Sequence, residues 1–209
     1  MPNTSEAQAQ VLIASLRQQP LLVVLRAAQP SDLQPQIERL AGLGVRHIEI
    51  AWVDHPGWVN QVMALRQRFG QLHLGAASVV SGRALDDVVA AGLSFAVSPV
   101  LDPELLLRAG RHRLMLVPGV WSPSEVHQAR SLGCAVVKLF PAHTLGAGYW
   151  LSLGAPLGGL PFCIAAGGLG PAELNEWLGA GVDAVAIGGS LSTAQAWQEL
   201  AQWLSLRSG

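Results

Sequence analysis

Residues 133–141 read Gly133-Cys134-Ala135-Val136-Val137-Lys138-Leu139-Phe140-Pro141, and this stretch contains the repeating pattern from which the fold is predicted. A glycine supplies the left-handed residue that ends a helix, and an apolar run typical of a buried strand follows it at once. The same joint recurs at residues 44–50, 92–97 and 181–187. Each joint predicts a helix that ends directly before a buried strand.

The chain contains eight such strand-like runs, which are separated by segments with helical periodicity. Strict alternation of strand and helix predicts a parallel sheet with helices outside it, and eight units predict a closed (β/α)8 TIM barrel. Residues before Pro20 are expected to form an extra N-terminal helix across the barrel bottom. An open doubly wound sheet is the alternative, although the turn at residues 26–30 lacks the GxGxxG of a dinucleotide-binding fold. The runs are residues 21–26, 47–52, 73–78, 95–99, 114–119, 135–141, 162–168 and 184–190, and clear helical segments are 32–43, 57–69, 122–132 and 171–180.

Length and composition predict a single domain over residues 1–209. Hydrophobic residues make up 50% and charged residues 13% of the chain, which indicates heavily buried strands. A net charge of −1 provides no basic surface for nucleic acid or for an anionic membrane. We therefore expect no nucleic-acid partner and no membrane partner.

Residues 139–172 contain no Asp, Glu, Lys or Arg, but glycine and proline interrupt them throughout, so barrel interior and loop are predicted here rather than a membrane span. The N-terminus lacks the basic and apolar blocks of a secretory signal, which predicts a cytoplasmic protein. Cys134 and Cys163 lie in apolar segments without CxxC spacing. Buried free thiols are expected rather than a disulfide or a zinc site.

Lys138 is the only lysine, since the other twelve basic residues are arginines. Its position within a buried strand would lower the pKa of its amine by desolvation. An uncharged amine attacks a ketone and forms a Schiff base, which lets a protein without a metal turn a keto acid into an electron sink. The alternative is a strand-end lysine that reaches solvent or pairs with a carboxylate.

Barrel enzymes place their sites at the carboxyl ends of the strands, so polar residues late in each strand are the candidates. Strand parity places Glu49 on the inward face, because Ile48, Ile50 and Trp52 share the other one. Glu49 is then either half of an ion pair that fills the lumen, with Lys138 or Arg26 as partner, or an acid/base that serves the lysine. The candidates are Arg26, Glu49, Ser78, Ser98, Lys138 and Ser190.

Paired glycines end the last two strands, in Ala165-Ala166-Gly167-Gly168-Leu169 and Ile187-Gly188-Gly189-Ser190. Each pair is expected to open a helix, where free backbone N–H groups bind an anion such as phosphate. Tight turns without a ligand are the alternative.

Motifs along nearly the whole chain resemble the 2-keto-3-deoxy-6-phosphogluconate and 4-hydroxy-2-oxoglutarate aldolases, abbreviated KDPG and KHG aldolases. The most specific is Val137-Lys138-Leu139-Phe140-Pro141-Ala142. The others are Val23-Val24-Leu25-Arg26, Ile48-Glu49-Ile50, Gly75-Ala76-Ala77-Ser78-Val79, Ser98-Pro99, Val117-Pro118-Gly119-Val120, Ala166-Gly167-Gly168 and Ile187-Gly188-Gly189-Ser190.

The resemblance implies a class I aldolase with no metal and no cofactor, usually a homotrimer. It implies Lys138 as the Schiff-base nucleophile and Glu49 as the acid/base. Ser78 corresponds to a threonine that holds the pyruvate portion. A phosphate would meet Gly167, Gly168, Gly188, Gly189 and Ser190.

The chain departs from the family after Glu49, where the family usually continues Thr-Leu-Arg-Thr and uses the arginine to bind the substrate carboxylate. Here Val53 holds the arginine position, and Arg26 is the candidate replacement. Trp52, Trp58, Trp121 and Trp150 are expected near the barrel mouth, where they would narrow the pocket or contact another subunit.

The sequence predicts a class I aldolase that reversibly cleaves a 2-keto-4-hydroxy acid, of the KDPG or KHG type, to pyruvate and an aldehyde. A diverged barrel that binds a phosphorylated or carboxylated metabolite without aldol chemistry is the alternative, motivated by Val53. A sugar-phosphate isomerase or epimerase on the same fold is a third possibility.

Overall fold

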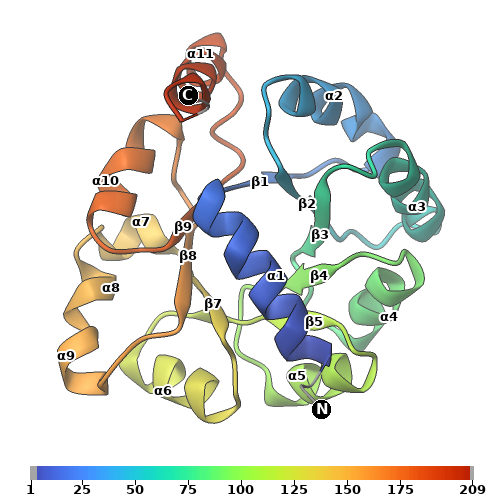
Figure 1. The fold of residues 1–209 in the computed structure, drawn as a ribbon. Coiled ribbons are helices and arrows are strands. Elements are labelled where there is room, and N and C mark those ends of the chain that lie inside the picture. The colour runs from blue at the N-terminus through green and yellow to red at the C-terminus, as the bar shows by residue number, and fades with distance from the viewer. Residues whose placement is uncertain (1–3, 208–209) are drawn as a thin grey trace.

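The computed structural model describes residues 4–207, and its strands form a nearly closed parallel barrel surrounded by helices (Figure 1). Every strand pairing is parallel, and the strand order is β5-β4-β3-β2-β1-β9-β8-β7-β6. The predicted TIM barrel is confirmed. The strands are β1 Leu21–Leu25, β2 His47–Ala51, β3 His73–Ala77, β4 Phe95–Val97, β5 Met115–Val117, β6 Gly119–Val120, β7 Val136–Leu139, β8 Phe162–Ala166 and β9 Ala184–Ile187.

Strands β5 and β6 are two parts of the fifth predicted strand, separated by Pro118. Proline has no N–H and interrupts a ladder, so β5 pairs with β4 while β6 pairs with β7. The Lys138 N–H donates to the Pro118 carbonyl over 2.9 Å, which joins the two sides at this point.

The predicted helices all form, with bounds that differ by a few residues from the expected ones. Helix α6 begins with a capping box in which Ser122 and Glu125 exchange hydrogen bonds, as the sequence pattern there indicates. The helices that follow the strands are α2 Gln34–Gly42, α3 Trp58–Arg68, α4 Gly82–Ala90, α5 Pro103–Arg111, α6 Pro123–Ser131, α10 Leu174–Gly179 and α11 Ala194–Ser205, with short 3-10 helices η1 Pro30–Leu33 and η2 Pro171–Glu173 before α2 and α10.

Alternate residues of each strand face two separate cores. Leu21, Val23, Ile48 and Ile50 pack outward against the helices. Leu22 instead packs into the barrel lumen, together with Phe95, Val97, Met115, Val117, Ile164 and Ala186. This alternation is the period of two that governs strands, and it decides which polar side chains share the lumen.

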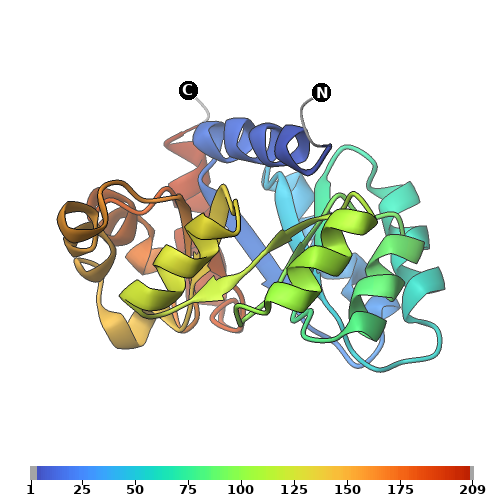
Figure 2. The same cartoon turned by 90° about the horizontal axis from the view of Figure 1, so that it is seen from below.

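Helix α1 (Thr4–Gln18) lies across one end of the barrel, as predicted (Figures 1 and 2). Its buried side chains Ala9, Leu12, Ile13 and Leu16 join the lumen cluster. The helix covers the amino-terminal ends of the strands, so the carboxyl ends are left as the open mouth.

The segment predicted as interior and loop after β7 contains three helices of one turn each, α7 Ala142–Leu145, α8 Tyr149–Ser152 and α9 Gly154–Leu157. Its glycines are compatible with the turns between these helices, since Gly146 and Gly158 both have positive φ. Within residues 4–207, no helix is long and apolar enough to cross a membrane.

Candidate active site

Lys138 projects into the barrel lumen from β7. Its neighbours Val137 and Leu139 pack outward, and the lysine itself is only 9% exposed. Its Nζ atom lies 4.4 Å from the centre of the Phe140 ring, which stands two residues later. Burial lowers the pKa of the Lys138 amine, Glu49 opposes this shift, and the positive charge of Arg26 adds to it.

Glu49 is the second buried ionisable group of the lumen, on β2, and is 1% exposed. Burial raises the pKa of its carboxyl to about 7, although the charge of Lys138 acts in the opposite direction. No ion pair of the described residues joins the two side chains directly. The two groups therefore influence each other's charge. Lys138 lines the cavity at the carboxyl ends of the strands, whereas Glu49 is buried behind it and is not one of the lining residues.

Arg26 and Ser78 follow β1 and β3, the two neighbours of β2. The Arg26 Nη2 donates to the Ser78 Oγ over 2.7 Å. Ser78 has a φ of 62°, a left-handed conformation that is uncommon for a residue other than glycine and that clusters at functional sites.

A cavity of about 730 Å³ opens at the carboxyl ends of the strands. Its volume is within the range of small-molecule sites. Gln36 of α2 also lines it, although no motif in the sequence indicates a role for this residue. The lining includes Arg26, Ser78, Lys138 and Phe140 together with residues 166–169 and 186–192.

The two glycine turns lie against each other in this cavity, since the Ser190 hydroxyl donates to the Leu169 carbonyl over 3.0 Å. Within the described chain, the N–H groups of Gly168, Leu169, Gly189 and Ser190 donate no hydrogen bond to the protein. The expectation that each glycine pair opens a helix is wrong in detail. A short 3-10 helix starts at Pro171, and α11 starts at Ala194 with Thr193 as its cap.

Ser98 has a structural role instead of a place in the cavity lining. It is buried, and its hydroxyl accepts the N–H of Val100 over 3.2 Å. The tryptophans expected at the mouth do not line the cavity either. Trp58 and Trp150 are buried in the outer core, and only Trp121 is exposed.

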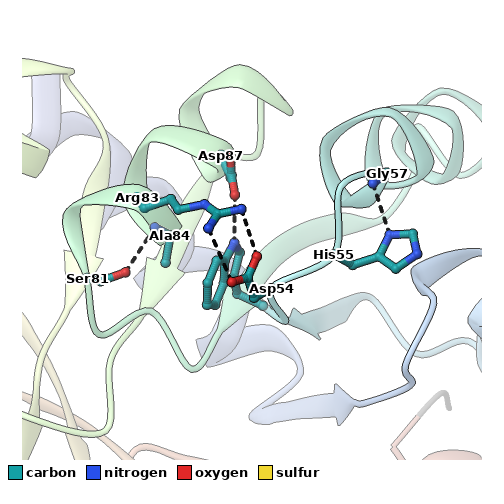
Figure 3. A network of polar contacts seen from close by, with 8 residues as sticks. Asp54, His55, Gly57, Ser81, Arg83, Ala84 and Asp87 are labelled. Atoms are coloured by element: carbon teal, nitrogen blue, oxygen red, sulfur yellow. Dashed lines mark hydrogen bonds and ion pairs between the residues drawn. The ribbon is translucent and has the colours of Figure 1, made fainter.

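The loop at Val53 is attached to α4 (Figure 3). The Arg83 guanidinium forms an ion pair with Asp54 at 2.7 Å, and the Trp52 indole N–H donates to Asp87 over 2.9 Å. Figure 3 also shows His55, which turns back to accept the N–H of Gly57. The cavity lining contains none of the residues of this loop, so the family arginine position provides no cation to the site.

Among residues 4–207, no group of three or more His, Cys, Asp or Glu side chains is arranged to hold a metal ion. Both cysteines are free thiols, as predicted; Cys163 is buried, whereas Cys134 is only partly so.

The chain is similar to known proteins over nearly its whole length. The family model for KDPG and KHG aldolases matches residues 12–206. The chain belongs to the KDPG and KHG aldolase family. It is thus a member of a family of carbon–carbon lyases.

The aldolase is 27% identical to the 2-dehydro-3-deoxy-6-phosphogalactonate aldolase of Escherichia coli K12, over 84% of this chain and 85% of that one. It is 29% identical to the KHG/KDPG aldolase of the same organism, over 82% and 79% of the two chains. A solved structure described as native KDPGal is similar with a TM-score of 0.77 at 26% identity, covering 90% of this aldolase and 92% of that chain.

Proposed function

We propose that this aldolase cleaves a 2-keto-4-hydroxy acid, of the KDPG or KHG type, to pyruvate and an aldehyde through a Schiff base on Lys138. The observation that carries the proposal is the shared lumen of a buried lysine and a buried glutamate beneath an open cavity. Family membership supports the same reaction.

In the proposed reaction, the uncharged Lys138 amine attacks the C2 ketone and loses water to give an iminium ion. The C3–C4 bond then breaks, its electron pair moves into the iminium ion to form an enamine, and the C4 hydroxyl loses its proton to release the aldehyde. The enamine takes up a proton at C3, and hydrolysis of the resulting imine releases pyruvate and the free amine.

Glu49 is proposed as the group that moves these protons, through a water molecule. With a pKa of about 7, its carboxyl is available in both the protonated and the ionised form near neutral pH, which is what a general acid/base requires. Its lack of a direct ion pair with Lys138 supports this role over that of a structural charge filling the lumen.

The keto acid carboxylate is proposed to bind Arg26, which stands in for the absent arginine at Val53. The guanidinium offers further donors besides the one used by Ser78, and a charge-assisted pair with a carboxylate suits it. Ser78 is proposed to hold the pyruvate portion beside it.

We call the two turns at Gly167, Gly168 and Leu169 and at Gly188, Gly189 and Ser190 the cradle. The end of the substrate distant from the keto acid is proposed to bind there. The free N–H groups of these turns face no protein acceptor, and backbone donors of this kind bind phosphate or carboxylate. An anionic aldehyde therefore suits the cavity.

A release assay tests the proposed reaction. The wild-type protein is expected to form pyruvate from KDPG or KHG, detected by reduction with lactate dehydrogenase, and Lys138→Met is expected to form none. Arg68→Gln is a suitable control, because it alters the exposed ion pair with Glu38. Absence of pyruvate with every 2-keto-4-hydroxy acid tried would contradict the proposal.

A second candidate function is favoured by one observation, the absence of the family arginine at Val53. A barrel that only binds a carboxylated or phosphorylated metabolite would retain its ligand in Lys138→Met and show no turnover as wild type. The homotrimer and the cytoplasmic location stay predictions, and sedimentation of the purified protein tests the first of them.

A further inference from the structure

The cradle lacks a side-chain cation of its own. Arg26 and Lys138 are the only lysine or arginine side chains in the cavity lining, and both are assigned above to the pyruvate half of the substrate. The donors around Gly168 and Ser190 are backbone N–H groups. Any ionisable side chain beside these turns would therefore have a marked effect on an anion bound there.

His143 stands directly beside the cradle. Its backbone N–H donates to the Gly167 carbonyl over 3.1 Å. A Cβ atom placed on Gly168 would lie 2.8 Å from the His143 Cβ, so the close approach requires glycine at this position. The imidazole is 67% exposed, and His143 adjoins the cavity lining at Gly167 and Gly168 without being part of it.

Glu173, the last residue of η2, stands next to His143. Its Oε1 lies 3.5 Å from the His143 Nδ1, while its Oε2 accepts the N–H of Gly170 over 2.8 Å. The carboxylate thus occupies one backbone donor beside the cradle and brings a negative charge that would repel a bound anion. Protonated His143 offsets that charge.

We propose that His143 and Glu173 form a charge pair that sets the preference of the cradle for an anionic substrate terminus, with His143 favouring the anion and Glu173 opposing it. The assignment rests on the proposed function for its substrate, although anion binding at the cradle is measurable without turnover. His143 acts here as a specificity-determining residue, placed by Glu173.

Two substitutions that change the side-chain charge in opposite directions test the pair. His143→Gln removes the cation, and Glu173→Gln removes the anion while it keeps an oxygen that can accept from Gly170. Binding of inorganic phosphate to the wild type and to both variants is measured by titration calorimetry in the same buffer. We expect roughly three- to tenfold weaker binding in His143→Gln and roughly three- to tenfold tighter binding in Glu173→Gln.

A merely structural role would weaken phosphate binding in both variants, and that result overturns the proposal. Equal binding by wild type and both variants overturns it too, as does a wild type that binds no phosphate at millimolar concentrations. His127→Gln, an exposed substitution on α6, is the matched control and is expected to leave binding unchanged.

Turnover separates this inference from the proposed function. If the aldolase cleaves both a phosphorylated and an unphosphorylated keto acid, the ratio of their kcat/KM values should fall in His143→Gln and rise in Glu173→Gln. Opposite shifts in phosphate binding without any aldol cleavage would keep the charge pair and remove the proposed reaction. Cleavage of both substrates with an unchanged ratio of kcat/KM values would keep the proposed reaction and remove the charge pair.

Discussion

The Arg26 guanidinium donates to the Ser78 hydroxyl over 2.7 Å and so connects the ends of β1 and β3 on either side of the strand that carries Glu49. The same guanidinium contributes to the lowered pKa of Lys138. One arginine can therefore serve both as an anchor for a carboxylate and as a charge that disfavours protonation of the lysine.

Replacing Arg26 is expected to weaken binding of the keto acid. Arg26→Gln removes a charge-assisted contact worth about 1.5–3 kcal/mol, which corresponds to a roughly 10- to 150-fold rise in the Kd of pyruvate. The change in the Kd of pyruvate is measured by steady-state inhibition with pyruvate. Arg68→Gln, which alters an exposed ion pair with Glu38, is the control, and equal effects in the two variants would remove Arg26 from the site.

An arginine at position 53, where the family has one, is expected to compensate in part for the loss of Arg26. Val53→Arg in the Arg26→Gln background should recover some of the lost affinity for pyruvate if the Asp54–Arg83 ion pair lets the loop turn toward the cavity. Combining it with Arg83→Gln, which frees the loop, should increase the recovery. If neither variant recovers affinity, the carboxylate does not bind near residue 53 in this protein.

The inward placement of Glu49 and Lys138 was predictable, because the apolar residues beside each of them share the other face of the strand. The Arg26–Ser78 and His143–Glu173 contacts were not, since they join side chains far apart in the sequence, whose meeting depends on loop conformation. The short helices after β7 escaped prediction because four-residue turns have no amphipathic period. The sequence predicts Trp58 and Trp150 near the mouth, whereas the structure buries them in the outer core.

The activity of the wild-type aldolase is expected to rise with pH through about 7. The pKa of Glu49 is raised to about 7, and its ionised form accepts the C4 hydroxyl proton during cleavage. Glu49→Gln should lower kcat by about 10²- to 10⁴-fold and remove this limb of the profile. A limb that persists unchanged in Glu49→Gln belongs to another group.

Ionisation of Glu49 should also lower the free energy of unfolding as the pH rises. A carboxyl whose folded pKa is raised contributes stability below its unfolded value near 4.5 and loses it through about 7. The loss is up to about 3 kcal/mol. Denaturant unfolding of wild type and Glu49→Gln on both sides of this range measures it, and a parallel pH dependence in the two proteins would contradict it.

Burial of His47, which lies at the opposite end of the barrel from the cavity, is expected to make the folded protein less stable in acid. Its ring is fully buried, bonded to the Ser15 hydroxyl at 2.7 Å and to the Leu21 carbonyl at 3.1 Å, and stacked on His73. Burial is the main cause that lowers its pKa to about 4, with the charge of His73 adding to it.

The stability that neutral His47 contributes is present above about pH 6.5 and is lost as the pH falls toward 4. The loss amounts to about 3 kcal/mol. His47→Gln should flatten the dependence of the unfolding free energy on pH in this window, whereas the exposed His127→Gln should not. If His47→Gln retains the full acid dependence, another group is responsible.

The most direct test is to trap the covalent intermediate. Wild-type protein treated with pyruvate and sodium borohydride is expected to gain one reduced pyruvyl group on Lys138, located by peptide mass analysis, with none in Lys138→Met. Since Lys138 is the only lysine, a modified lysine peptide identifies the site without ambiguity. An unmodified Lys138 after treatment with pyruvate and with a 2-keto-4-hydroxy acid would contradict the Schiff-base account.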